Sequence, residues 1–110
     1  MVISVATRMT SLRDRAEWEK RLARVMPQIE KILRQQQGFV SAEFRWGVHS
    51  DGSVSNITTW ESDEDAVRYN RGGAAATIDW LDQLVAPPNP DYRNAPRRFT
   101  YASESIVVSR

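Results

Sequence analysis

The chain has 110 residues, of which 41% are hydrophobic, and its 15 Lys and Arg residues against 14 Asp and Glu residues leave a net charge of +1. This length suits one compact domain over residues 1–110, which buries about two thirds of the surface that its unfolded chain exposes. The small net charge argues against the strong basic field of a dedicated nucleic-acid binder, so we expect no nucleic-acid partner.

The chain contains no cysteine and one histidine. Disulfides and thiolate nucleophiles are therefore impossible, and the usual ligands of transition metals are missing, so we expect no bound metal. The N-terminal residues lack the pattern of a secretory signal, and no run of 18 apolar residues is present to span a bilayer. We expect a cytoplasmic protein without membrane contact.

The first predicted elements are a strand and a long amphipathic helix. The sequence VISVATRM, residues 2–9, mixes apolar, small and β-branched residues, which is typical of a strand covered on both faces. Ser11 and Asp14 resemble a capping box, so the helix is expected to begin there. Apolar residues then recur at three- and four-residue steps, and Pro27 predicts a kink or a restart within this helix. Gly38 supplies the left-handed residue that ends a helix.

Two further strands follow, joined by a hairpin. The sequence FVSAEFRWGV, residues 39–48, alternates apolar and polar side chains, which places Val40 on the apolar side. The segment 49–53 contains an Asp-Gly pair, the signal of a tight hairpin turn. The strand at 54–61 is therefore expected to run antiparallel to its predecessor.

The last part of the chain predicts a broken helix and a final strand. Ser62 and Asp65 form a second candidate capping box, which opens a short helix that Gly72 interrupts. A further helix is predicted over 78–85, where apolar residues repeat at helical spacing before a proline-rich loop. Aromatic and β-branched residues then predict a strand over 99–108.

The order of these elements is β-α-β-β-α-β, with the last helix broken in two. This order predicts an α+β fold of the ferredoxin-like, split β-α-β type, with one antiparallel sheet and helices on one face. Apolar residues occur on both sides of several strands, so the second face of the sheet needs a cover. A partner sheet from a second copy of the chain supplies one, and we therefore expect a homodimer.

Asn56 is the candidate site residue that the pattern itself singles out. It lies four residues before Trp60, so both side chains point to the same face of the strand. A partly buried amide that is left unpaired costs about 1 to 3 kcal/mol, so it needs a partner. Either Asn56 bonds a neighbouring backbone group while Trp60 fills the core, or both line a mostly apolar pocket. The residue pattern leaves both interpretations open.

Aromatic side chains extend this candidate site. In the predicted topology Trp46, Trp60, Tyr69 and Trp80 come near one another and can form a slot for a flat aromatic or hydrophobic molecule. Arg71 is one of several arginines able to grip an anion, although scattered arginines are usually solvated or paired. Trp46, Trp80 and Arg71 are accordingly the candidate substrate-binding residues.

The runs GFVSAEF and DGSVSNITTWESDEDAVRYN resemble the antibiotic-biosynthesis monooxygenase family of dimeric α/β barrels, over about residues 2–104. The most specific part is an Asn ahead of a W-E-S triplet that follows a D-G hairpin. The resemblance implies a cofactor-free oxygenation, in which a phenol or anthrone-type ring loses a proton and its anion reacts with O2 to give a quinone. Asn56 is implied as a hydrogen-bond donor to a substrate oxygen, and Trp60 as a donor or a stacking surface.

Two features depart from this resemblance. Ala66 and Val67 occupy the place where the polyketide oxygenases have a tyrosine, so Tyr69 becomes the candidate for proton transfer. A helix turns by roughly 100° per residue, so Tyr69 need not face the same spot. The chain has no histidine after His49, which disfavours the haem-degrading branch of the superfamily.

The resemblance thus implies a cofactor-independent monooxygenase that oxidises a planar phenolic or polycyclic substrate to a quinone with O2. A non-catalytic dimeric barrel that binds a small hydrophobic ligand is the alternative, because a fold does not settle a chemistry. An isomerase or lyase on the same scaffold is a third possibility.

Overall fold

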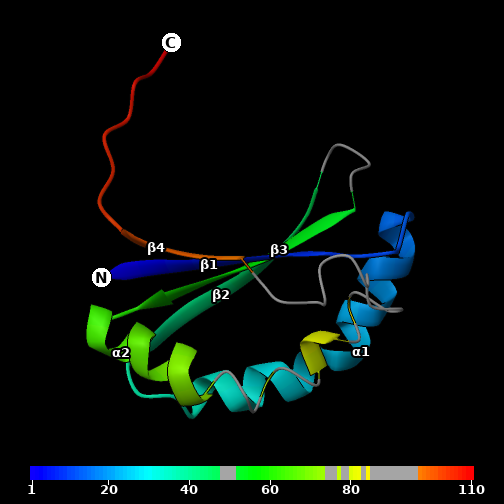
Figure 1. Cartoon of the computed structure of the whole chain (residues 1–110), viewed down its shortest axis with the longest axis horizontal. Coiled ribbons are helices and arrows are strands. Elements are labelled where there is room, and N and C mark those ends of the chain that lie inside the picture. The colour runs from blue at the N-terminus through cyan, green and yellow to red at the C-terminus, as the bar shows by residue number, and fades with distance from the viewer. Residues whose placement is uncertain (48–51, 74–76, 78–79, 83, 85–96) are drawn as a thin grey trace.

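The computed structural model describes residues 1–47, 52–73, 77, 80–82, 84 and 97–110 (Figure 1). Four antiparallel strands form one sheet in the order β2-β3-β1-β4: β1 (Val2–Met9), β2 (Phe39–Trp46), β3 (Ser53–Trp60) and β4 (Arg97–Ala102). The helices α1 (Arg15–Arg34) and α2 (Asp63–Arg68), with the π-helical turn η1 (Tyr69–Gly73), lie on one side of this sheet (Figure 1). The predicted α+β, ferredoxin-like arrangement is confirmed.

The period-two alternation of the strands decides which side chains meet the helices. In the central strand β1, Ser4, Ala6 and Arg8 are buried, while the residues between them are half-buried. In β3, Thr58 and Trp60 are buried on the same face. The hydrophobic core therefore lies between this face and the helices.

The helix α1 begins at Arg15, so the predicted start at Ser11 is wrong. Asp14 is the N-cap, and its carboxylate accepts a hydrogen bond of 2.9 Å from the backbone N–H of Ala16. Asp14 is as good a cap as serine, and it stands directly before the periodic apolar residues.

Pro27 lies inside α1, which continues as one helix to Arg34. The predicted restart at this point is therefore wrong. Val25 and Ile29 are buried on either side of the proline, and their packing holds both halves of the helix against the sheet. Tertiary packing thus outweighs the hydrogen bond that proline removes.

The edge strand β2 contains an irregularity at its start. Phe39 pairs with Trp60 and Ser41 pairs with Thr59, so Val40 is an extra residue in β2. Such a bulge shifts the alternation by one position. Val40 is 45% exposed and Phe39 packs against the core in its place, so the predicted position of Val40 on the apolar side is wrong. The predicted antiparallel pairing of β2 with β3 is confirmed, while residues 48–51 of the hairpin lie outside the described part.

The structure describes the second half of the chain less completely. Ser62 caps α2 as predicted, since its Oγ accepts a hydrogen bond of 3.2 Å from the N–H of Asp65. The helix predicted over 78–85 lies largely outside the described residues, although Trp80–Asp82 are helical. The loop that precedes β4 lies outside them up to residue 96.

The strand β4 is shorter than predicted. It begins at Arg97 and ends at Ala102, whereas the sequence pattern predicts a strand up to Val108. Ala102 pairs with Val2, which is the first residue of β1. Beyond that point β1 offers no further partner, so the remaining β-branched residues have no strand to pair with in this sheet.

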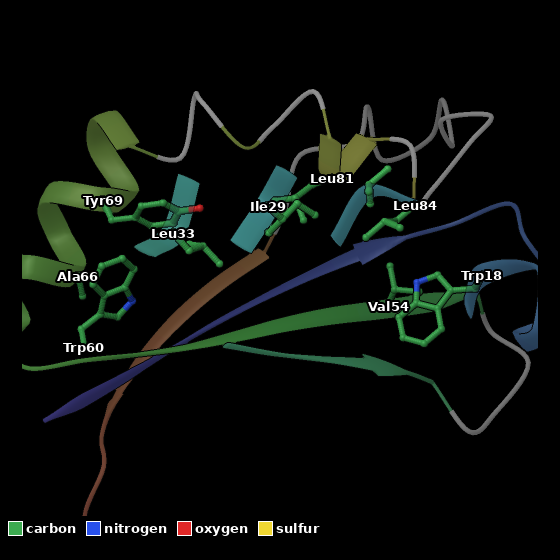
Figure 2. Packing of buried hydrophobic residues seen from close by; sticks show 10 residues of the cluster. Trp18, Ile29, Leu33, Val54, Trp60, Ala66, Tyr69, Leu81 and Leu84 are labelled. Atoms are coloured by element: carbon green, nitrogen blue, oxygen red, sulfur yellow. The ribbon is translucent and has the colours of Figure 1, made fainter. Parts of the chain in front are cut away.

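Aromatic side chains lie at both ends of the core (Figure 2). Trp60 and Tyr69 lie together with Ala66 at one end, while Trp18 lies near Val54 at the other. Side chains of α1, among them Ile29 and Leu33, fill the space between these groups. In the described part of the chain, no helix is both long and apolar enough to cross a membrane.

Candidate functional site

Asn56 lies in the middle of β3, opposite Ala6 of β1 and Phe44 of β2. Its side chain is half-buried on the face that the helices cover, as the alternation predicts. With the residues that the structure describes, the Asn56 side chain forms no hydrogen bond. Its amide is therefore free to donate to a ligand and to accept from one.

A small cavity lies beside Asn56, between β3 and the helical layer. Its volume is about 10 Å³, which is room for a single water molecule. The cavity is lined by Arg8, Trp18, Phe44, Val54, Ser55, Asn56, Leu81 and Leu84. Most of the wall is apolar, and a few polar groups reach it, which is the usual character of a small-molecule site.

Trp18 brings an unused donor to this cavity. The residue is 4% exposed, and its indole nitrogen has no hydrogen-bond partner among the residues that the structure describes. Its ring contacts Trp46, with ring centroids 5.7 Å apart. A buried N–H without a partner costs about 1 to 3 kcal/mol, so a ligand that accepts this hydrogen bond gains that energy back. The sequence pattern gives no sign of this, because an indole on the apolar stripe of a helix looks like any core residue.

Arg8 and Asp82 form an ion pair at the same cavity. Arg8 is 5% exposed, whereas the side chain of Asp82 is 44% exposed. The hydroxyl of Thr10 donates a hydrogen bond of 3.4 Å to the carbonyl of Leu84. This ion pair and this hydrogen bond hold Leu81 and Leu84 over the cavity. We call residues 81, 82 and 84 the cover. Arg8 was not among the predicted site residues, because a lone arginine in a strand carries no motif.

Trp60 does not line this cavity. It is fully buried, and its indole N–H donates a hydrogen bond of 2.8 Å to the hydroxyl of Thr58. Its ring centroid lies 5.7 Å from that of Phe39 and 4.9 Å from that of Tyr69. Four residues of strand separate it from Asn56, which is about 13 Å. Of the two interpretations that the residue pattern leaves open, the one in which Asn56 and Trp60 line the same pocket is therefore wrong, because Trp60 fills the core.

Tyr69 belongs to the Trp60 end of the core. It is 5% exposed, and its hydroxyl shares a hydrogen bond of 2.7 Å with the hydroxyl of Thr77. Burial raises the pKa of the Tyr69 hydroxyl above its ordinary value, while the bond to Thr77 and the charge of Arg98 oppose this rise. Tyr69 is therefore protonated at neutral pH and suited to donate a proton rather than to remove one.

Replacing Tyr69 with phenylalanine is expected to have a pH-dependent effect on stability. Below pH 10 the wild type keeps an advantage of about 1 kcal/mol from the Thr77 hydrogen bond. Above the unfolded pKa the unfolded tyrosine ionises, while the raised folded pKa keeps the native hydroxyl protonated. The wild type then loses stability with rising pH, and its advantage shrinks. Urea unfolding of both proteins at pH 7 and about pH 11 measures this, and a constant difference would contradict it.

The three remaining candidate residues lie in different places. Trp46 is half-buried and reaches the Asn56 cavity only through its contact with Trp18. Trp80 is half-buried and packs against the core. Arg71 is exposed and lines an open depression on the outer side of α2 and η1, away from Asn56. Among the described residues, no group of three His, Asp or Glu side chains is placed to hold a metal ion.

Comparisons with known proteins give matches in three-dimensional structure but none in sequence family. No family model matches the sequence, and no curated protein matches it. Solved structures do match over almost the whole chain. The monooxygenase ActVA-Orf6 of Streptomyces coelicolor, solved with the ligand nanaomycin D, superposes with a TM-score of 0.65 at 18% identity, covering 99% of this chain and 92% of that chain.

Two further structures show the breadth of this group. SnoaB, a cofactor-independent oxygenase from Streptomyces nogalater, matches with a TM-score of 0.57 at 18% identity, over 98% of both chains. The heme-degrader MhuD from Mycobacterium tuberculosis, solved with two hemes, matches with a TM-score of 0.62 at 18% identity, over 97% of this chain and all of that chain. The chain therefore has the ferredoxin-like fold of the antibiotic-biosynthesis monooxygenases, as its sequence resemblance implies.

Proposed function

We propose that this chain is a cofactor-independent monooxygenase that oxidises a planar phenolic or polycyclic substrate to a quinone with O2. The observation that carries the proposal is the side-chain amide of Asn56, which no described residue satisfies and which faces a cavity on the helix-covered side of the sheet. Structural neighbours described as a monooxygenase and a cofactor-independent oxygenase support the reaction class.

The chemistry requires the protein to stabilise a developing negative charge and to keep water away from it. An anthrone-type ring loses a proton from its CH2 group, and the resulting anion passes electrons to O2. One oxygen atom of O2 enters the ring as a carbonyl group, and the other leaves as water. Asn56 donates an amide hydrogen to the oxygen on which negative charge develops, and the indole N–H of Trp18 is a second donor in the same cavity. The apolar wall keeps water from the anion.

Substrate entry requires the cover to move. A molecule of two or three rings needs a pocket of several hundred Å³, against the present volume of about 10 Å³. Leu81 and Leu84 close the cavity, and the Arg8–Asp82 pair together with the Thr10 hydrogen bond hold them in place. We expect substrate binding to displace this segment from the sheet.

Trp60 and Tyr69 have a different part in the proposal. Both are proposed to support the site by packing rather than by contact with the substrate, because they lie together at the other end of the core, about 13 Å of strand from Asn56. Trp46 and Trp80 are proposed to flank the ring once the cover has moved. Arg71 lies in a separate depression away from Asn56, so it is proposed to hold an anionic group only of a substrate long enough to reach the outer side of α2 and η1.

The test is an aerobic incubation of the protein with anthrones, followed by the absorbance of the quinone product. Asn56→Ala is expected to lower the rate of quinone formation by about 100- to 1,000-fold, the loss typical for one donor to a developing oxygen anion. Thr59→Ala is the matched control, since Thr59 lies in the same strand on the opposite face. An unchanged rate in Asn56→Ala would remove Asn56 from the mechanism.

The alternative function is a non-catalytic barrel that binds a small hydrophobic ligand. The observation that favours it is the closed core, in which Trp60 is fully buried and the cavity beside Asn56 holds one water molecule at most. In that case phenolic ligands raise the melting temperature of the protein while no quinone forms.

A homodimer is part of the same proposal. The face of the sheet opposite the helices carries the apolar row Phe99, Val5 and Ile57, which are paired across three strands. No described element of the chain covers this row (Figure 1). The sheet of a second copy, packed about 10 Å away, buries it.

A further inference from the structure

Arg8 is a buried cation in the central strand β1. It lies on the helix-covered face of the sheet and is 5% exposed. A guanidinium keeps its charge at any pH at which the protein is folded, so folding takes this charge out of water. A buried charge needs a compensating group close by. The carboxylate of Asp82 supplies one, through an ion pair with the Arg8 guanidinium.

This compensating carboxylate belongs to the segment that a ligand has to displace. Asp82 is part of the cover, and its side chain is 44% exposed in the closed protein. Displacement of the cover therefore moves Asp82 into water at little cost. Arg8 stays behind, because it belongs to a strand that is paired on both sides. A ligand that displaces the cover meets a buried cation that has just lost the Asp82 carboxylate.

Arg8 also lies within reach of a ligand bound at Asn56. Ala6 pairs with Asn56 and Arg8 pairs with Val54, so Arg8 and Asn56 are diagonal neighbours, with Cα atoms about 7 to 8 Å apart. Both residues line the same cavity. One molecule of two or three fused rings is long enough to contact both side chains.

The rest of the cavity wall indicates the body of such a ligand. Figure 2 shows Trp18, Val54, Leu81 and Leu84 together at this end of the core, and all four line the cavity. Most of this wall is apolar, and the indole N–H of Trp18 has no hydrogen-bond partner among the described residues. The wall therefore suits a flat apolar ring system that carries hydrogen-bond acceptors.

We propose that the ligand of this cavity is an aromatic carboxylic acid, whose carboxylate replaces that of Asp82 at Arg8 while its ring lies beside Asn56. Asp82 already accepts a hydrogen bond from the Arg8 guanidinium, so a carboxylate fits this position. A neutral ligand breaks the same ion pair and puts no charge in its place. The inference rests on the proposed function, because it places the ring beside Asn56, and it names the substrate class as an anthrone-type ring with a carboxyl group.

Two matched probes test the preference for an acid. An anthraquinone carboxylic acid and its carboxamide have the same rings and nearly the same shape, and they differ in charge. Both are already quinones, so titration calorimetry on the full-length chain measures binding without turnover. We expect the wild type to bind the carboxylate at least about 10-fold more tightly than the carboxamide. Equal dissociation constants would overturn the proposal.

Replacing Asp82 with asparagine tests the competition for Arg8. The variant removes the carboxylate that the ligand has to displace, so we expect the preference for the acid to rise to about 100-fold. A looser cover helps both probes alike and leaves the ratio of their dissociation constants unchanged. Asp63→Asn is the matched control, because Asp63 is an exposed aspartate on α2. A ratio in Asp82→Asn no higher than in this control would overturn the exchange of carboxylates.

The variant Arg8→Met/Asp82→Asn tests Arg8 as the cation. It removes the buried charge together with the Asp82 carboxylate, and we expect it to bind the two probes with dissociation constants within about 2-fold of each other. Arg8→Lys keeps a positive charge without the planar fork, and we expect it to keep part of the preference for the acid. A full preference in the double variant, or none in a folded Arg8→Lys protein, would overturn the role of Arg8.

The outcomes separate this inference from the proposed oxidation. A preference for the acid that depends on Arg8, in a protein that forms no quinone from anthrones, overturns the oxygenase and supports the carboxylate site. Quinone formation by a protein that binds the two probes equally overturns the carboxylate site and leaves the oxygenase standing. A wild-type protein that binds neither probe also overturns the carboxylate site.

Discussion

Replacing Trp60 with alanine is expected to lower the free energy of unfolding by about 3 to 5 kcal/mol, the range for removing a fully buried large aromatic residue. Trp60 is 0% exposed and is packed between Phe39 and Tyr69. The substitution leaves a cavity and removes the indole N–H that donates a hydrogen bond to the Thr58 hydroxyl. Because a domain of this size has only about 5 to 15 kcal/mol of stability, this one change removes a large share of it.

Urea unfolding followed by circular dichroism measures the effect without relying on tryptophan fluorescence. Trp46→Ala is the matched control, since Trp46 is half-buried at the other end of the core and is expected to cost less. A loss below about 1 kcal/mol in Trp60→Ala is the result that would contradict the packing described for this residue. It would reopen the interpretation of Trp60 as part of an accessible pocket.

Replacing Asp82 with asparagine is expected to cost about 2 to 3 kcal/mol of stability, because hydrogen bonds between charged groups are the strong ones. Arg8 is 5% exposed, so its guanidinium stays in the protein when the compensating carboxylate is lost. The same change loosens the cover over Asn56. We therefore expect faster uptake of phenolic ligands together with the lower stability.

The control for this second change is an ion pair that is exposed to solvent on the surface of α1. Arg15 and Glu19 are 2.8 Å apart with side chains 69% and 53% exposed, so Glu19→Gln is expected to cost about 0.5 kcal/mol or less. The double variant Arg8→Met/Asp82→Asn is expected to recover part of the loss, because it also removes the buried charge that the Asp82 carboxylate compensates. Equal losses for Asp82→Asn and Glu19→Gln would show that the cover does not depend on the Arg8 pair.

Much of the fold was predictable because its signals are local. Alternation along β3 placed Asn56 on the helix-covered face, and Ser62 before three acidic residues marked the start of α2. The D-G pair between two strand-like runs predicted the antiparallel pairing of β2 with β3. Each of these features depends on a few neighbouring residues and the geometry of one element.

Three of the errors have a common origin in contacts between distant residues. The bulge at Val40 follows from the register of β2 against β3, and the end of β4 at Ala102 follows from the length of β1. The continuation of α1 through Pro27 depends on the core beneath it. None of these is visible in the segment where the error occurs.

The sequence by itself determined the order of the elements, the face on which Asn56 lies and the presence of tryptophans on that face, because the two periodicities of side-chain direction are properties of the backbone. Only the tertiary structure decided how those side chains are used. It bonds the indole of Trp60 to Thr58, whereas the indole of Trp18, beside Asn56, finds no partner in the described part of the chain. The physical reason is that a hydrogen bond between side chains requires two groups to meet within about 3 Å. The packing of the helices on the sheet and the register of the strands set that distance.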